Sequence, residues 1–197
     1  APILIFLFAL FSTPVWGQKT GSNPCQSIGY PDSARTSYKP LFYDINLDID
    51  VEAQRIEGFV DIKFQWLEAG AALAFNLADS LQVDSVFLNG KRRHFSRHSK
   101  SRSVLVKGSK DLELHSINHL TVHYGGRPQV AQNPPWDGGF TWAKDSLGQN
   151  WVGLSCQKEG ASLWFPNNDL LANERKGMRI TCRYPDDLFF VSNGRLI

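Results

Sequence analysis

Three histidines, His115, His119 and His123, recur at every fourth residue. On a helix this spacing would stack their imidazoles on one face, where they could bind a metal ion. The surrounding Leu120-Thr-Val-His-Tyr124 is β-branched and alternating, however, which favours a strand. Along a strand the three rings lie well apart, and no Glu stands beside His115 to act as a general base. We therefore expect solvent-facing strand histidines and no metal site.

A basic run follows the turn pair Asn89-Gly90 and precedes Val104. Clustered cations attract phosphates or sulfated sugars, so the run could form a polyanion-binding patch. Its position between two apolar stretches instead favours the solvated face of a hairpin, and we prefer that interpretation. The run comprises Lys91, Arg92, Arg93, His94, Arg97, His98, Lys100, Arg102 and Lys107.

The three cysteines are Cys25, Cys156 and Cys182, and no Cys-x-x-Cys occurs. Cys156 and Cys182 could form a disulfide if their strands are neighbours and the compartment is oxidising. Alternatively, both could be buried free thiols that act as small hydrophobes. The spacing disfavours a zinc ribbon or a thioredoxin-like redox site.

The length and charge of the chain limit the number of domains and the kinds of partner to expect. The chain has 197 residues, a formal charge of +2 and 20% charged residues. This length suits one ordinary domain with a sizeable core. The near-neutral charge gives no reason to expect nucleic acid or an anionic membrane as a partner.

The chain opens with a continuous apolar run from Ile3 to Phe11, followed by Ser-Thr-Pro and then Val15-Trp-Gly17. This pattern is typical of a signal peptide whose basic first part is missing, so we expect residues 1–17 to direct export to the periplasm, cell envelope or exterior. The run falls short of the about 20 apolar residues that span a bilayer. Residues 18–37 are expected to be an extended leader, and the chain to be truncated at both ends.

From Tyr38 onward the pattern is β. Apolar residues alternate with acidic and polar ones from Tyr43 to Val51 and again from Ile56 to Trp66, which predicts an antiparallel hairpin with one buried and one solvated face. Many short strands with turns between them predict an all-β, antiparallel sandwich. The further predicted strands are Leu73 to Leu77, Gln82 to Leu88, Ser103 to Val106, His119 to Tyr124, Asn150 to Cys156, Met178 to Tyr184 and Phe189 to Ser192.

Several segments resemble the N-terminal β domain of the alanyl aminopeptidase (aminopeptidase N-like) superfamily of zinc aminopeptidases, in its bacterial envelope branch. The resemblance covers about Tyr38 to Ile197 and implies a saddle-like β domain that packs on a thermolysin-like catalytic domain. The segments are Tyr43-Asp-Ile-Asn-Leu-Asp-Ile-Asp50, Ile56-Glu-Gly-Phe-Val60, Leu120-Thr-Val-His-Tyr-Gly-Gly-Arg-Pro128, Pro135-Trp-Asp-Gly-Gly-Phe-Thr-Trp142, Trp164-Phe-Pro-Asn-Asn-Asp169 and Val191-Ser-Asn-Gly194.

The resemblance implies one substrate-binding residue. Gln157 matches a Gln or Glu that accepts a hydrogen bond from the free α-amino group of a peptide substrate. An ammonium offers three donors, and an amide oxygen can accept one of them. Trp136, Phe140, Trp164 and Asp169 are expected to line a pocket or to act as scaffold. The chain departs from the family pattern at Asn167, where many members have Cys, and at Leu171, where many have Pro.

The catalytic residues implied by the resemblance are not in this chain. Neither His-Glu-x-x-His nor Gly-x-Met-Glu-Asn occurs between Ala1 and Ile197. In the family, two His of the first motif and a downstream Glu hold Zn²⁺, so the zinc ligands are expected beyond Ile197, on a catalytic domain that would be this domain's partner. The fragment alone is expected to be inactive and to bind no active-site metal.

A second interpretation is a free-standing secreted β-sandwich that binds protein or glycan. Its binding surface would be an aromatic platform of Trp136, Trp142, Trp151 and Trp164. A stand-alone binding domain should expose these aromatic rings, whereas the N-terminal domain of an enzyme should bury most of them or cover them with another domain.

Overall fold

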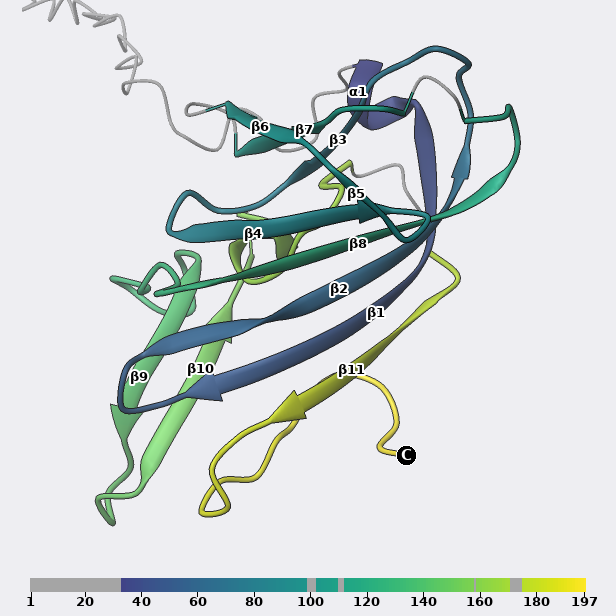
Figure 1. The fold of residues 1–197 in the computed structure, drawn as a ribbon. Coiled ribbons are helices and arrows are strands. Elements are labelled where there is room, and N and C mark those ends of the chain that lie inside the picture. Colours follow the sequence, from purple (N-terminus) through teal and green to yellow (C-terminus); the bar gives the residue numbers. More distant parts are fainter. Residues whose placement is uncertain (1–32, 99–101, 110–111, 158, 171–174) are drawn as a thin grey trace, which may run out of the picture.

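A computed structural model describes residues 33–98, 102–109, 112–157, 159–170 and 175–197. The described chain is almost entirely β, which confirms the predicted fold class (Figure 1). None of its helices is long and apolar enough to cross a membrane. The elements are α1 (Ser33–Thr36), β1 (Tyr38–Asp50), β2 (Arg55–Trp66), β3 (Leu73–Asn76), β4 (Leu81–Leu88), β5 (Lys91–Arg93), β6 (Phe95–His98), β7 (Ser103–Val106), β8 (Ile117–Gly126), β9 (Gly139–Lys144), β10 (Asn150–Ser155), η2 (Ala161–Leu163) and β11 (Gly177–Arg183).

A large sheet of six strands forms one layer, in the order β11-β1-β2-β8-β4-β5. The predicted hairpin is β1 paired with β2, in an antiparallel register that sets Ile45 opposite Val60. Alternate residues of these strands, such as Tyr43, Ile45 and Ile62, are fully buried, while Asp44 and Asp61 lie on the other face. The period-2 pattern therefore decided which face of the sheet meets the core.

Two smaller sheets cover the inner face of the large one. A three-stranded sheet, β3-β7-β6, contributes Phe75 and Val104 to the core, and the two-stranded sheet β10-β9 contributes Phe140. These residues belong to the same buried cluster as Ile45 and Ile62 of the large sheet. The β9–β10 ribbon lies beside the turn that joins β1 to β2 (Figure 1).

The sheet has one parallel pair, which the predicted antiparallel arrangement did not include. β11 runs parallel to β1, with Ile45 opposite Ile180. Two arginines on β11 tie the pair together on the solvated face: Arg179 bonds Asp44, and the Arg183 Nη2 atom donates to Asp48 Oδ2 at 2.6 Å. The Arg183 guanidinium lowers the pKa of the Asp48 carboxyl. Opposite charges at directly paired positions help to fix this register.

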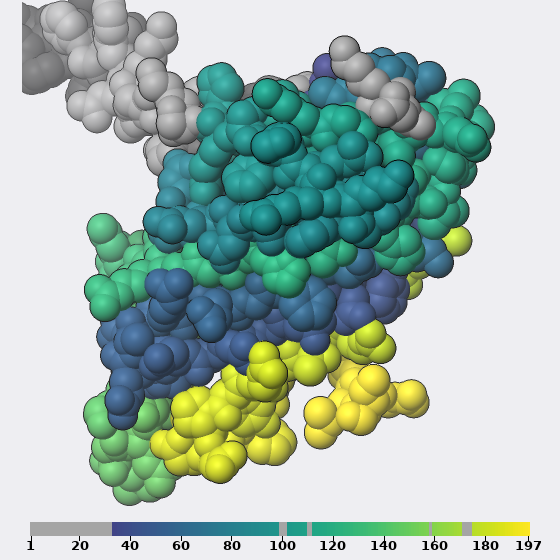
Figure 2. Space-filling view, viewed as in Figure 1, coloured from purple at the N-terminus to yellow at the C-terminus, as the bar shows by residue number. Residues whose placement is uncertain are grey.

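The predicted strand Phe189 to Ser192 is wrong. Phe189 and Val191 are each 79% exposed and lie in irregular chain. This segment forms one wall of a groove of about 600 Å³, with Phe42 and β11 on the other side. In Figure 2 the last residues, in yellow, stand apart from the body of the domain. Apolar alternation without a neighbouring strand to bond or a surface to cover does not produce a strand.

The ordered domain reaches into the segment expected to be an extended leader. Residues 33–36 form helix α1, and Arg35 and Ser37 are buried. The Ser37 hydroxyl donates to the Ala72 carbonyl at 2.7 Å, which joins this segment to the residues before β3. The predicted signal peptide at 1–17 and Cys25 lie outside the described residues.

We expect Gly58→Ala to destabilise the domain by about 3 kcal/mol, because overpacking against a rigid neighbour forces a backbone shift. A Cβ at Gly58 would lie 2.0 Å from the Asn46 carbonyl oxygen on β1. Urea unfolding followed by tryptophan fluorescence measures the change.

The matched control is Gly70→Ala. Gly70 has a φ of +71°, but a Cβ there meets nothing within 4 Å. It should cost only the backbone strain, about 1 kcal/mol. Equal losses for the two variants would contradict the close approach of β2 to β1 at Gly58.

Candidate functional site

Gln157 lies in an exposed turn at the end of β10. β10 ends at Ser155, and the chain then turns so that the Gly160 N–H donates to the Cys156 carbonyl at 3.1 Å. Gly160 has a φ of +85°, a conformation that favours glycine. η2 begins at the next residue. Residues 156, 157, 159 and 160, which we call the recognition turn after the role predicted for Gln157, lie at this bend, and Gln157 is exposed there.

The Asp169 carboxylate supports the recognition turn from below. Asp169 is 7% exposed, and a Cβ built on Gly160 would lie 3.0 Å from Asp169 Oδ1. The Asn167 amide donates to the same oxygen at 2.6 Å. Burial raises the pKa of Asp169, and the hydrogen bond from Asn167 opposes part of that rise. Asp169 is therefore a buried contact of the turn, and the pocket or scaffold role predicted for it stays a prediction.

Glu159 holds the other side of the recognition turn. Its Oε2 atom accepts a hydrogen bond from Arg102 Nη2 at 2.8 Å, and the two side chains are only 22% and 10% exposed. A Cβ on Gly138 would lie 2.5 Å from Glu159 Cγ, so the Glu159 stem packs directly on that glycine. Sequence reasoning did not single out Glu159, because its partner is 57 residues away in the chain.

The predicted aromatic residues divide into core and surface. Phe140 is 3% exposed and stacks on Trp142 at 5.3 Å, so it belongs to the core. Trp164 is half-buried and meets Phe165 edge-on at 4.5 Å. Trp136 is 71% exposed. Of the four residues predicted as pocket or scaffold, only Trp136 faces solvent in the way that Gln157 does.

The departure from the family pattern at Asn167 has a structural role. Asn167 is 2% exposed, and its backbone N–H donates to the Asn76 carbonyl at 2.9 Å while the Asn76 N–H donates back at 2.6 Å. Its side chain also receives a hydrogen bond from Arg175 at 2.8 Å. Asn167 therefore bridges β3 to the segment that carries Asp169. Leu171 lies outside the described residues.

The histidines do not converge on one point. His119 and His123 lie on β8, and the His119 imidazole is 2.7 Å from an Asp61 oxygen. The His123 ring lies 5.4 Å from that of Phe59. His115 is in the turn before β8. Among the described residues, no group of three or more His, Cys, Asp or Glu side chains could hold a metal ion.

Some side chains of the basic run form hydrogen bonds within the domain. Arg97 donates to the carbonyls of Leu77 and Ala78 at 2.7 and 2.6 Å, and Arg102 binds Glu159. β4 and β5 form the predicted hairpin around Asn89-Gly90. These internal contacts leave fewer cations available to a polyanion than the sequence suggested.

Cys156 and Cys182 are free thiols, so they do not pair. Cys156 is exposed, in contrast to the buried thiol that was the other alternative. Partial burial raises the pKa of the Cys182 thiol to about 11. Although Cys156 as a residue is exposed, neighbouring atoms partly desolvate its thiol and raise its pKa too. A thiol with a raised pKa is a weak nucleophile at neutral pH.

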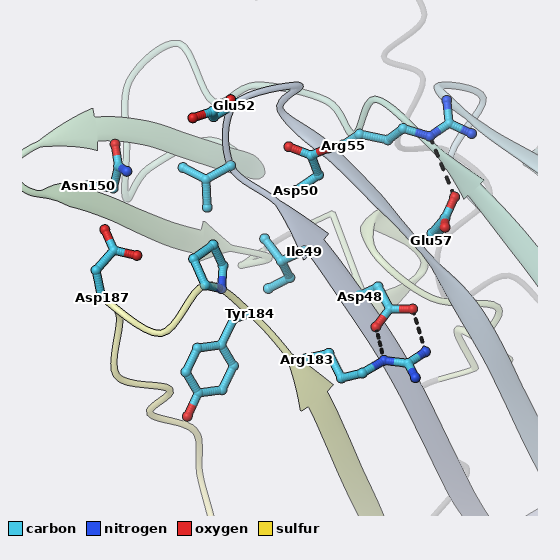
Figure 3. A pocket seen from close by; sticks show the side chains of 12 residues that line it. Asp48, Ile49, Asp50, Glu52, Arg55, Glu57, Asn150, Arg183, Tyr184 and Asp187 are labelled. Atoms are coloured by element: carbon cyan, nitrogen blue, oxygen red, sulfur yellow. Dashed lines mark hydrogen bonds and ion pairs between the residues drawn. The ribbon is translucent and has the colours of Figure 1, made fainter.

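A separate pocket of about 570 Å³ lies at the opposite end of β10 (Figure 3). Asp50, Glu52 and Asp187 stand around it, while Asp48 and Arg183 face each other within it. The predicted site residues are not part of its lining. This pocket is therefore distinct from the recognition turn.

No protein-family model and no curated protein matches the chain. Its fold is similar to solved structures of zinc metallopeptidases. Against native leukotriene A4 hydrolase from Saccharomyces cerevisiae the TM-score is 0.61 with 19% identity, over 81% of this chain and 25% of that one. Against an M1 zinc metallopeptidase from Deinococcus radiodurans it is 0.58 with 20% identity, over 79% and 34%. A mutant of that metallopeptidase bound to a Tyr-Ser-Ala substrate gives 0.58 with 21% identity, over 79% and 35%.

At these identities the likeness shows a shared fold. The chain spans between a quarter and about a third of the length of these structures. The predicted sandwich-like β domain is thus one that solved zinc metallopeptidases also contain.

We expect Asp169→Asn to change the pH dependence of stability. A raised folded pKa means that the folded state holds the Asp169 proton more tightly than the unfolded state, where the pKa is about 3.9. As the pH rises from that value through the raised pKa, the wild type should lose stability that the variant keeps. Unfolding free energies of both proteins between pH 3 and 8 measure the difference.

Glu52→Gln is the control for this titration, because Glu52 is an exposed carboxylate in the turn after β1. It makes the same change from carboxylate to amide at an exposed position. A constant difference between Asp169→Asn and wild type across the range would contradict a raised pKa at Asp169.

Proposed function

We propose that this chain is the N-terminal domain of an exported zinc metallo-aminopeptidase, and that it recognises the free α-amino group of a peptide. One observation carries the proposal. The residue selected by the sequence resemblance, Gln157, lies on an exposed turn that the buried Asp169 and the partly buried Glu159 contact, within a fold that solved zinc metallopeptidases share.

The chemistry of Gln157 fits an ammonium group. Its amide oxygen accepts a hydrogen bond, and an α-ammonium group offers three donors and no acceptor. An acceptor on a clamped turn keeps its position without paying a further ordering cost when the peptide binds. A peptide that lacks a free amino end would leave this acceptor without its partner. An exopeptidase can in this way distinguish a free peptide N-terminus from a blocked one.

Zinc would come from another part of the protein. The described residues hold no group that fits a metal ion, and the whole chain lacks His-Glu-x-x-His. In a zinc aminopeptidase the ion lowers the pKa of a bound water, and a nearby Glu acts as its general base. Gln157 is neutral, so the charge that balances the ammonium would also come from the catalytic domain, through the Glu of Gly-x-Met-Glu-Asn.

Export is part of the proposal. It rests on the apolar run from Ile3 to Phe11 and the small residues that follow it, before Gln18. The bacterial envelope branch of the family rests on the ordered motifs from Pro135 to Gly194. A precursor that is shortened to an N-terminus at or near Gln18 after secretion would support both points, and an unprocessed cytoplasmic product would contradict export.

We expect Gln157→Ala, made in a protein that carries this domain together with its catalytic domain, to lower kcat/KM for a free-amino dipeptide. The loss should be about 10- to 100-fold, because a hydrogen bond to a charged group contributes about 1.5–3 kcal/mol. Steady-state hydrolysis of the dipeptide and of its N-acetyl derivative measures the discrimination between them.

Gln149→Ala is the matched control. Gln149 is an exposed glutamine in the turn between β9 and β10, at the other end of the ribbon from Gln157. It should retain wild-type discrimination. If Gln157→Ala discriminates between the two peptides as well as the wild type does, Gln157 does not bind the amino group.

The 197-residue chain by itself should release no amino acid from peptides, with or without added Zn²⁺, because it lacks the ligands and the general base. Fluorogenic aminoacyl substrates provide a sensitive assay. Zinc-dependent turnover by the purified chain would overturn this expectation.

A secreted binding module is the second candidate function. Trp136 and Trp151 are 71% and 54% exposed, and the Trp151 ring lies flat enough over Gly153 that a Cβ there would be 2.6 Å from it. Exposed rings of this kind stack on apolar partners or sugar faces. Saturable quenching of tryptophan fluorescence by an oligosaccharide, lost in Trp151→Ala, would favour this function.

A further inference from the structure

We propose that Arg102 is a positioning residue for the recognition turn. By its hydrogen bonds to Glu159 it fixes the place at which Gln157 contacts the substrate amine. The proposal rests on the proposed function of Gln157. Arg102 does not touch the turn residue Gln157 in the described contacts and contributes no group to the substrate. Its effect is transmitted through Glu159.

Arg102 is firmly anchored in the three-stranded layer. It directly precedes β7, and its backbone has a φ of +51°, which is unusual for a residue with a side chain. Its carbonyl accepts a hydrogen bond from the Leu77 N–H at 2.8 Å. The residue as a whole is 8% exposed. The guanidinium therefore projects from a fixed base and has little freedom to reorient.

The guanidinium grips Glu159 at two places. Arg102 Nη2 donates to the Glu159 carboxylate at 2.8 Å, and Nη1 donates to the Glu159 main-chain carbonyl at 3.4 Å. The first contact fixes the side chain and the second fixes the backbone of the turn. Arginine suits this task because its planar group presents several donors in a fixed geometry, whereas lysine is a single flexible point charge.

Close packing restricts the movement of Glu159 away from Arg102. Its stem packs on Gly138, where there is no room for even a Cβ, and Gly160 lies against the Asp169 carboxylate. The recognition turn is thus held between two layers of the sandwich at Glu159 and Gly160. Gln157 is only two residues before Glu159 in the same turn. The hydrogen bond from the Gly160 N–H to the Cys156 carbonyl closes the turn around Gln157, so a shift of Glu159 would displace the Gln157 backbone.

Removing Arg102 should weaken amine recognition, because the hydrogen bond from the amine to Gln157 depends on the position of the Gln157 side chain. A displacement of about 1 Å in a positioned group can cost about 100-fold in rate. Losing Arg102 would leave the partly buried Glu159 carboxylate without its cation, and we expect the turn to move so that water can hydrate this carboxylate. The Gln157 side chain would be unchanged, but it would no longer be positioned to accept a hydrogen bond from the substrate amine.

The test uses the active protein with its catalytic domain. Arg102→Ala should raise KM for a free-amino dipeptide by about 10-fold, with a smaller change in kcat, and should reduce discrimination against the N-acetyl peptide. Arg102→Lys should recover part of the discrimination. Arg102→Ala combined with Gln157→Ala should be little worse than Gln157→Ala alone, because both changes remove the same contact.

Arg97→Ala is the matched control. Arg97 is also a partly buried arginine that donates to main-chain carbonyls, those of Leu77, Ala78 and Leu81, but among the described residues it makes no contact with the recognition turn. It should lower the melting temperature and leave discrimination unchanged. If Arg102→Ala also lowers only the melting temperature, Arg102 is merely structural and the proposal fails.

A second measurement separates this proposal from the function it rests on. Hydrogen exchange of the Gly160 and Leu163 amides, both bonded within the turn and η2, reports on the order of the turn without any substrate. Faster exchange in Arg102→Ala than in Arg97→Ala supports positioning even if Gln157→Ala shows that Gln157 does not bind the amine. Equal exchange in the two variants overturns it.

Discussion

Hydrogen bonds of the buried segment Asn167-Asn168-Asp169 join parts of the domain that are far apart in sequence. The Asn168 amide donates to the Arg35 carbonyl beside α1 at 2.9 Å, and the Asp169 N–H donates to the Asn76 side chain on β3 at 3.3 Å. Buried polar groups cost free energy unless they are paired, so these contacts select one arrangement of the layers. The rest of the domain is built around that arrangement.

The same segment connects the sandwich to its parallel edge strand. Arg175 donates to Asn167 and to the Asn168 carbonyl, and its guanidinium lies 5.1 Å from the centre of the Tyr43 ring. β11 begins two residues later and pairs with β1. Arg175 thus links the buried segment to the residues just before β11. The Asp44–Arg179 and Asp48–Arg183 ion pairs then join β11 to β1.

Asp169 and Glu159 are largely buried and hold the recognition turn, while Gln157 itself is exposed. An exposed amide on a clamped turn can offer an acceptor to a ligand at little ordering cost. The acidic pocket at the other end of β10 is a different environment, so its charges need not interfere with recognition at Gln157.

The sequence by itself determined most of the strands, whereas the turn that carries Gln157 was not predicted. Alternation from Tyr43 to Val51 and from Ile56 to Trp66 is a local signal, because each residue's face follows from the pleat. The short strand Gly139–Lys144 was missed, since it forms only against a neighbour that the sequence does not specify. The apolar alternation at Phe189 to Ser192 misled for the same reason.

Only the tertiary structure decided how the site is held. The Arg102–Glu159 pair and the contact of Asp169 with Gly160 join segments whose distance along the chain gives no clue to their contact. The parallel pairing of β11 with β1 likewise depends on where the preceding buried segment leaves the core. Local patterns fix which face of a strand is buried, but the partner of a buried charge is fixed only when the layers pack.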